Sequence, residues 1–430
     1  MLLCAFIPSS TPLVRTAVDD PPGTRNVFGT AHAHETEHFV IRWDTDFTPD
    51  PDALEQLAID AEAAWSAQMD DLGWPAPPGT ETWKLDLFFG ASGPNAPEMD
   101  FSGGYVYPYE HDGTPYMVIS TDIPDQYATE PEGPFDVLAH ELNHTLQYHS
   151  GDAYWGERGL FLWEATASWV TPLVTGNEAA IAGWGRYLLH PELTVTTASY
   201  DFDDPLRGAR QYDAATFLQY LSETRGLGPD LIRDLWIEAV PGVDPLEWLD
   251  LRVEGGIRDV FVGFAVSHAL GEHPYAGLYE QGIEDEGTAG GDWQVTGSLG
   301  TRGGEGRMED RAPEGFAWNR LVWTVQEAGS ATVGITPDAR GDHGSPTTLV
   351  TELVRERDGV LEHLPFTGTT RLDVLPGDVL HTIVVAVPVE YEDGERFPYA
   401  FSARLDEEPT GCGCTATRGN PGLAGLLARR

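Results

Sequence analysis

The stretch DVLAHELNHTLQYHSG, residues 136–151, gives the clearest indication of the fold in this 430-residue chain. Two histidines, His140 and His144, stand four positions apart, and Glu141 follows the first of them. On a helix, residues four apart lie one above the other on the same face, close enough for both imidazoles to bind one metal ion. Glu141 would project beside them and could reach a metal-held water. The spacing therefore predicts a zinc site with its own general base.

The residues around this motif predict a buried helix over 135–149. Pro134 suits a first helical turn and Gly151 suits a C-terminal cap. The motif alone also arises by chance, so the residues around it matter. Apolar residues enclose His140, Glu141 and His144 on nearly every side of the helix: Phe135, Val137, Leu138, Ala139, Leu142 and Leu146. Two histidines and a carboxylate on a buried helix are costly unless something satisfies them, and a cation would do so.

A third zinc ligand is expected in GLFLWEATASWV, residues 159–170. This apolar helical run contains one carboxylate, Glu164, and no basic residue. Burying that charge unpaired would be strongly unfavourable, whereas coordination to a dication offsets the loss of water. The flanking Trp163 and Trp169 favour burial, although Glu164 facing solvent on a surface helix is the alternative. The predicted zinc ligands are therefore the two histidines of the motif and Glu164.

Composition limits the classes of function. The chain has 69 Asp and Glu against 25 Lys and Arg, which argues against binding nucleic acid or anionic lipid through a general positive field. Calcium could be held by DFDDP at 201–205 or YEDGE at 391–395, but neither matches an EF-hand loop. Three cysteines occur, Cys4, Cys412 and Cys414, so neither domain interior holds a pair that could form a disulfide.

The two ends of the sequence bear on location. No apolar run reaches the roughly 18–20 residues that span a bilayer. The start, MLLCAFIPSS, is apolar but has no basic region, so either an export signal is incomplete here or this is not the natural start. At the other end, GCGC, the apolar PGLAGLLA and two arginines resemble the C-terminal sorting tail of myxobacterial surface proteins, with a disordered tail carrying free thiols as the alternative. We expect an exported, extracellular or surface-bound protein.

Hydrophobic patterns outline the remaining elements. HFVIRW at 38–43, WKLDLFF at 83–89 and PYMVIST at 115–121 have the content of strands, and residues 51–72 have the spacing of an amphipathic helix. Residues 134–271 are predicted to be mostly helical. A Gly-rich and acidic stretch follows, and after it short alternating runs separated by turns predict an antiparallel β-sandwich.

At this point the chain resembles a known group of enzymes. An HExxH motif followed by a glutamate 20 positions after the second histidine is similar to the gluzincin metallopeptidases, which include thermolysin-like and aminopeptidase-like enzymes. More closely, HFVIRW, LGWPAP, AHELNHTLQY, WEATASWV and FLQYLSE resemble a bacterial family of secreted metalloproteases common in myxobacteria. In that family a zinc-binding helix and a W-E-x-x-A-x-W segment precede a β-sandwich. The resemblance covers about residues 36–405.

The resemblance implies further roles for single residues. In aminopeptidase-like gluzincins a tyrosine near a helix start stabilises the oxyanion, and Tyr212 stands at such a place, with an ordinary helix-start tyrosine as the alternative. Thermolysin-like enzymes carry an aspartate four residues after the ligand glutamate to orient a zinc histidine, where this chain has Ser168. Asn143 or Thr166 could replace that aspartate. Three further polar candidates have less support: His111, Tyr148 and His149, the last better understood as an exposed helix end.

The expected fold class is α+β, with a zincin-like metallopeptidase domain, built from a mixed sheet and a mostly helical second half, followed by an antiparallel β-sandwich. The expected divisions are an N-terminal leader, the metallopeptidase domain, a linker, the sandwich and a sorting-like tail: 1–35, 36–276, 277–292, 293–407 and 408–430.

The expected function is a zinc-dependent endopeptidase with one Zn²⁺, in which Glu141 takes a proton from zinc-bound water and passes it to the leaving amine. PEMDF at 97–101 is a poor match to the amine-binding motif of aminopeptidases, so an endopeptidase is favoured. The segment 102–121 would supply an edge strand for an extended substrate. The alternatives are a zinc aminopeptidase and an inactive zincin-fold adhesion protein. The expected partner is a protein or peptide substrate, and we expect a monomer.

Overall fold

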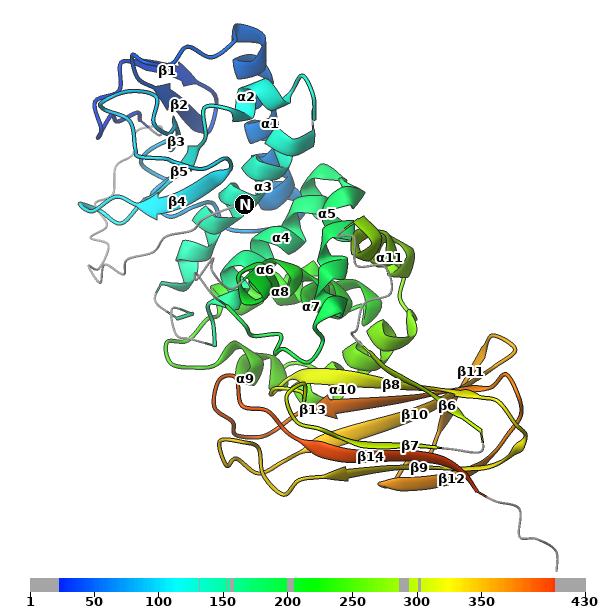
Figure 1. Ribbon diagram of the computed structural model, residues 1–430. Helices are drawn as coiled ribbons and strands as arrows, with labels where there is room; N and C mark the ends of the chain where they lie inside the picture. The colour runs from blue at the N-terminus through cyan, green and yellow to red at the C-terminus, as the bar shows by residue number, and fades with distance from the viewer. Residues whose placement is uncertain are drawn as a thin grey trace, which may run out of the picture.

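The computed structural model describes residues 23–130, 132–151, 153–154, 158–198, 205–285, 294–300 and 303–406. The expected tail at 408–430, the three cysteines, most of the leader and most of the acidic run at 201–205 lie outside these residues. Three parts follow one another along the chain: an N-terminal sheet with helices, a helical middle and a pair of C-terminal sheets (Figure 1). The chain therefore has a mixed α+β fold, as its sequence predicts.

The N-terminal sheet is mixed and five-stranded. Its strands lie in the order β1-β2-β3-β5-β4, in which β2, β3 and β5 run parallel and the two edge strands run antiparallel to their neighbours. The apolar LDLFF of β3 is buried along its whole length, as a central strand should be. The strand bounds are β1 (His32–Glu35), β2 (Phe39–Trp43), β3 (Leu85–Phe89), β4 (Gly104–Pro108) and β5 (Pro115–Ile119).

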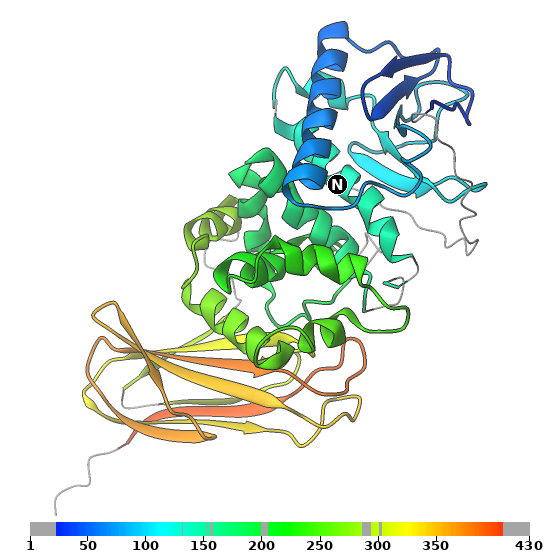
Figure 2. The same cartoon turned by 180° about the vertical axis from the view of Figure 1, so that it is seen from behind.

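Helices α1 (Pro51–Ser66) and α3 (Glu132–Gln147) pack together beside this sheet, with the short α2 (Ile123–Gln126) near one end (Figure 2). Asp50 begins α1 by accepting hydrogen bonds from the first-turn amides, and the helix continues into a π-helical turn, η1 (Ala67–Asp71). Apolar residues of α1, α3 and the strands form one buried cluster. The HExxH helix therefore lies between the sheet and the helical middle.

The helical middle surrounds a large aromatic core that includes Trp163, Trp169 and Trp236. Its α-helices are α4 (Phe161–Thr175), α5 (Glu178–Gly183), α6 (Pro205–Asp213), α7 (Ala215–Gln219), α8 (Pro229–Ile237), α9 (Pro245–Asp250), α10 (Gly256–Leu270) and α11 (Ala276–Asp285). Short 3₁₀ or π turns follow α3, α5 and α7, respectively: η2 (Tyr148–Ser150), η3 (Trp184–Leu189) and η4 (Tyr220–Thr224).

Helix α11 occupies the first part of the stretch 277–292, where the composition predicts a linker. The helix packs against α5 and η3. Gly282 lies so close to α5 that a Cβ atom there would stand 1.8 Å from the carbonyl oxygen of Ala182. Glycine, which suggests a loop in the sequence, here permits close contact between helices. The structure thus differs from the expected linker over 277–285, and residues 286–293 lie outside the described part of the chain.

The C-terminal part contains two sheets that share a buried core, with strand orders β11-β10-β13-β8-β6 and β12-β9-β14-β7. Their strand pairs are antiparallel apart from β6 with β8, which run parallel, where the sequence predicts an antiparallel sandwich throughout. The bounds are β6 (Gln294–Leu299), β7 (Gly304–Met308), β8 (Ala317–Val325), β9 (Gly329–Pro337), β10 (Leu349–Arg357), β11 (Val360–Leu364), β12 (Thr369–Val374), β13 (Val379–Ala386) and β14 (Tyr399–Asp406). Among the described residues, no helix has the length and apolar character needed to cross a membrane.

Candidate metal centre

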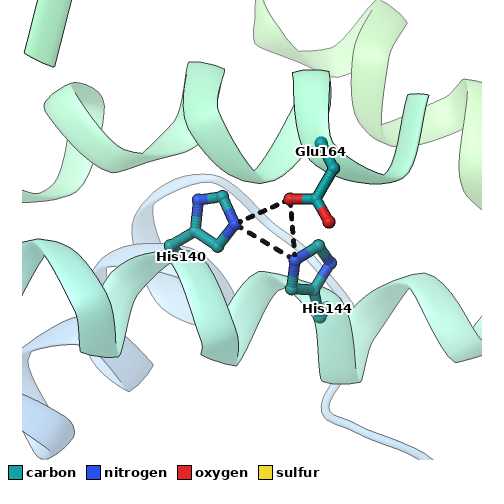
Figure 3. Close-up of side chains that lie close together, drawn as sticks. All are labelled: His140, His144 and Glu164. Carbon is teal, nitrogen blue, oxygen red and sulfur yellow. Dashed lines mark hydrogen bonds and ion pairs between the residues drawn. The ribbon is translucent and has the colours of Figure 1, made fainter. Parts of the chain in front are cut away.

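Helices α3 and α4 lie side by side and bring His140, His144 and Glu164 together, with their rings and carboxylate directed at one another (Figure 3). The Nε2 atoms of His140 and His144 are 3.1 Å apart, and each lies close to Oε2 of Glu164, at 3.2 and 3.5 Å respectively. The candidate ligand atoms of the trio all lie within 4.8 Å of one another. His140 is 5% exposed, and the other two side chains are fully buried.

This arrangement of donors suits a cation. Two imidazole nitrogens that face each other at this distance can share at most one proton, and their lone pairs repel when both are bare. Oε1 of Glu164 is buried and has no hydrogen-bond partner among the described residues, which is costly for a carboxylate. A metal ion at the common point would accept a lone pair from each residue. Two histidines and one glutamate form a known zinc ligand set that leaves a fourth position open.

The charges of these three residues are compatible with a cation at the same point. Burial lowers the pKa of His140. Burial also opposes a charge on His144, but the carboxylate of Glu164 outweighs it and raises the pKa of His144 to about 9. The two imidazoles in turn hold the pKa of Glu164 well below its usual range despite its burial. A positive charge among these three residues is therefore favoured: a proton on His144 supplies it in the free protein, and a divalent cation would supply it in place of that proton.

Glu141 extends from α3 toward the edge strand β4. It is fully buried, and neither carboxylate oxygen has a hydrogen-bond partner in the described part of the chain. Burial raises the pKa of Glu141 to about 8, the charge of Glu164 adds to this, and His144 opposes it. Gly104 of β4 lies directly against this side chain, since a Cβ atom there would stand 2.6 Å from Cγ of Glu141. The expected general base thus lies between the trio and the edge strand.

Tyr212 lies at the end of α6 and not near a helix start, where the sequence places it, and it stacks on one of the expected ligands. Its ring centroid lies 6.3 Å from that of His140, at an interplanar angle of 27°. The other polar candidates make different contacts. His111 is exposed beside Asp112, His149 is exposed against the carbonyl of Ala76, and Tyr148 packs edge-on against Trp163. Of the tyrosine and histidine candidates outside the motif, Tyr212 is therefore the one placed against a ligand.

The residue that orients His144 is Gln147, which is not among the candidates drawn from the sequence. Oε1 of Gln147 lies 2.8 Å from Nδ1 of His144, one helical turn away on α3. Asn143 instead contacts Gln68 and Gln147, and Thr166 accepts from the indole of Trp236. The expectation that Asn143 or Thr166 replaces the missing aspartate is therefore wrong for direct contact with this histidine. Gln147 could have been predicted from the sequence as the partner of His144, because residues three apart on a helix are neighbours on its surface.

Residues 6–256 match a protein family described as a family of unknown function (DUF6055). This match spans more than half of the sequence. The chain belongs to this family. Because the matched residues include α3 and α4, the candidate metal centre lies wholly within the family region. No curated protein matches the sequence.

Two solved structures are similar to part of the chain. One is the pre-peptidase C-terminal domain of collagenase from Bacillus anthracis, at 12% identity over 26% of this chain and 95% of that one, with a TM-score of 0.16. The other is PliG from Aeromonas hydrophila, a periplasmic inhibitor of g-type lysozyme, at 8% identity over 26% of this chain and 99% of that one, with a TM-score of 0.18. At these TM-scores neither similarity supports an argument about fold or function.

Proposed function

We propose that this DUF6055 protein is a zinc-dependent peptidase. In this proposal His140, His144 and Glu164 hold one Zn²⁺, and Glu141 is the general base for hydrolysis of a peptide bond. The observation that carries the proposal is the convergence of three buried ligand groups on one point, beside a buried carboxylate without a hydrogen-bond partner among the described residues. Either feature alone also occurs in proteins without enzymatic activity, but together they are the parts that metal-assisted hydrolysis requires.

Each residue has a defined part in the proposed reaction. When bound, the zinc ion supplies a Lewis acid that polarises a carbonyl and makes a nearby water more acidic. The raised pKa of Glu141, about 8, falls when a cation is held beside it, so that its carboxylate can accept a proton near neutral pH. The same residue then returns the proton to the leaving amine. Tyr212, stacked on His140, is the proposed donor to the developing oxyanion.

The sheet favours an endopeptidase over an aminopeptidase. Strand β4 is at the edge of the N-terminal sheet, and among the described strands it pairs with β5 alone. An extended peptide could pair with its other side, and Gly104 would then place the peptide backbone near Glu141. The mixed sheet, the HExxH helix beside it and the third ligand on the next helix support a zincin-like domain. The C-terminal sheets would be an accessory domain of an exported enzyme.

The test compares wild type with Glu141→Gln, using metal analysis and cleavage of casein or a peptide library. We expect about one zinc per chain in both proteins, and cleavage that falls by about 10²- to 10⁴-fold in the variant because the proton carrier is lost. Glu132→Gln, an exposed change on the same helix, is the matched control and should cleave like wild type. Undiminished cleavage by Glu141→Gln would show that the base is assigned wrongly. If zinc-loaded wild type cleaves nothing, the adhesion alternative is favoured.

A further inference from the structure

Three buried amide side chains, Gln68, Asn143 and Gln147, form a continuous series of hydrogen bonds that ends at His144. We call this set the amide relay. Gln147 Nε2 donates to Oδ1 of Asn143 at 3.0 Å, and Nδ2 of Asn143 donates to Oε1 of Gln68 at 3.0 Å. Oε1 of Gln147 faces Nδ1 of His144 at 2.8 Å. All three amides are fully buried. If one of them pointed its nitrogen and oxygen the wrong way, its hydrogen bonds would be lost, and no water could replace them.

Two backbone carbonyls determine the direction of every bond in the relay. Nε2 of Gln68 donates to the carbonyl of Ala139 at 2.8 Å, and Nε2 of Gln147 also donates to the carbonyl of Trp163 at 2.9 Å. A carbonyl only accepts, so both glutamines must present nitrogen there and oxygen at their other ends. Turning any amide over would set oxygen against oxygen. The oxygen of Gln147 therefore faces His144, and Nδ1 of that ring must be the donor.

We infer that the amide relay is a positioning device for the metal centre: it holds the proton of His144 on Nδ1 and so directs the lone pair of Nε2 at the metal. The role toward the metal rests on the proposed function, whereas the position of the proton does not. The relay also connects the helices that form the centre. Gln68 lies in the π-helical turn η1, and the Trp163 carbonyl belongs to the residue before Glu164 on α4. Gln147 thus aligns His144 with the helix that carries the third ligand.

The relay makes a prediction opposite to that of a simple acceptor. If Gln147 only accepted a bond from His144, a glutamate would serve at least as well, since a carboxylate is the stronger acceptor. In the relay, Gln147 must also donate to Asn143 and to the Trp163 carbonyl. A carboxylate would instead face two further acceptors with no proton to give. Gln147→Glu should therefore harm the centre as Gln147→Met does.

The test is zinc affinity, measured by competition with a chromogenic chelator, together with the melting temperature of each metal-free protein. Gln147→Met and Gln147→Glu should each weaken zinc binding by about 10- to 100-fold, the usual effect of losing a partner of a metal-bound histidine. Gln68→Met should weaken it less, and the double variant should lose less than the product of the two single losses, because both act through one path. Gln219→Met, another buried glutamine, which accepts from Tyr279, is the control. Wild-type affinity in Gln147→Glu or in Gln68→Met would overturn the relay.

A second measurement is independent of zinc. In protein labelled with ¹⁵N-histidine, the signals of His144 can be recognised by their absence in His144→Ala. Measured above about pH 9, where the ring of His144 carries a single proton, we expect that proton on Nδ1 both with and without zinc, and we expect the preference to be lost in Gln147→Met. A bare Nδ1 with the proton on Nε2 in wild type would overturn the relay. If Nδ1 is protonated but wild type binds no zinc, the relay stands and the proposed function fails.

Discussion

At the scale of single residues, Glu164 is the side chain that most needs the proposed metal. It is fully buried in an otherwise apolar helix, and one of its oxygens has no hydrogen-bond partner among the described residues. Among the described residues its charge is offset by two imidazoles: burial lowers the pKa of His140, whereas Glu164 itself raises the pKa of His144. A carboxylate retained in such a place is more easily understood as a ligand than as part of a core.

Glu164→Ala should therefore reduce zinc affinity by more than about 100-fold, because it removes a direct ligand, whereas loss of an outer partner costs about 10- to 100-fold. Chelator competition and metal analysis after dialysis would measure this loss. The exposed Glu178→Gln, on the neighbouring α5, should bind zinc like wild type. Should Glu164→Ala keep wild-type affinity, the third ligand lies elsewhere.

The trio could be predicted from sequence because its logic is local. The spacing of His140 and His144 fixes their common face on a helix, and the apolar neighbours of Glu164 make its burial predictable. The partner of His144 could not be predicted in the same way. Asn143 and Gln147 are both polar neighbours on one helix, and which of them meets Nδ1 depends on side-chain rotamers set by η1 and α4. Those contacts come from distant parts of the chain.

At the scale of elements, the contact between β4 and α3 gives a further test. Gly104 has an ordinary backbone conformation, so an alanine there is not strained, but its Cβ would stand 2.6 Å from Cγ and 2.9 Å from Oε1 of Glu141. Either the strand or the carboxylate must move, and overpacking of this kind typically costs about 1–3 kcal/mol. We expect Gly104→Ala to lower kcat in peptide cleavage while zinc stoichiometry stays at wild-type level.

The matched control for this change is Gly183→Ala, in α5, where an added Cβ meets nothing within 4 Å. It should leave both kcat and zinc content unchanged. Equal activity of Gly104→Ala and wild type would mean that the position of the Glu141 carboxylate against β4 does not matter for the reaction. Parallel melting curves of the two glycine variants would separate a local shift from a general loss of stability.

Strands and long helices were predictable where their patterns are regular, as in the apolar β3 and the amphipathic α1. Two features depended on packing that the sequence does not display. Gly282 of α11 permits close contact with α5, although the composition of this stretch suggests a linker. The π-helical turn η1 inserts Gln68 beneath α3, and π turns often occur near functional sites, but no local signal marks this one.

At the scale of the whole molecule, the helical middle lies against the first C-terminal sheet (Figure 1), and the two share one core. Phe261 of α10 packs against Phe316 at 5.4 Å between ring centroids, and Trp318 of β8 belongs to the helical cluster. The alternating pattern of β8 predicts a sandwich strand but not what covers its second face. The helical part and the sheets are therefore joined by apolar contact as well as by the chain, and the ion pairs Glu192 with Arg311 and Arg207 with Glu314 also cross this junction.

Glu192 lies at the junction and gives a test of stability against pH. Its carboxylate bonds to Arg311 of the C-terminal part at 2.9 Å and to His190 at 3.4 Å. Burial would raise its pKa, but these partners together lower it from the usual 4.5 to about 2. A carboxyl group with a lowered pKa in the folded state stabilises that state above its unfolded pKa. This contribution is lost as the pH falls from about 4.5 through about 2.

Glu192→Gln should therefore lower the free energy of unfolding by about 1–3 kcal/mol at pH 7, since Arg311 is partly exposed and solvent screens the pair. The difference from wild type should shrink steadily between about pH 4.5 and pH 2, because protonation removes the same charge from the wild-type protein. Urea unfolding followed by tryptophan fluorescence at several pH values measures both quantities. Glu327→Gln, an exposed change in the C-terminal part, should differ little from wild type at any pH. A difference for Glu192→Gln that does not change with pH would mean that this residue acts at the junction through its shape and not through its charge.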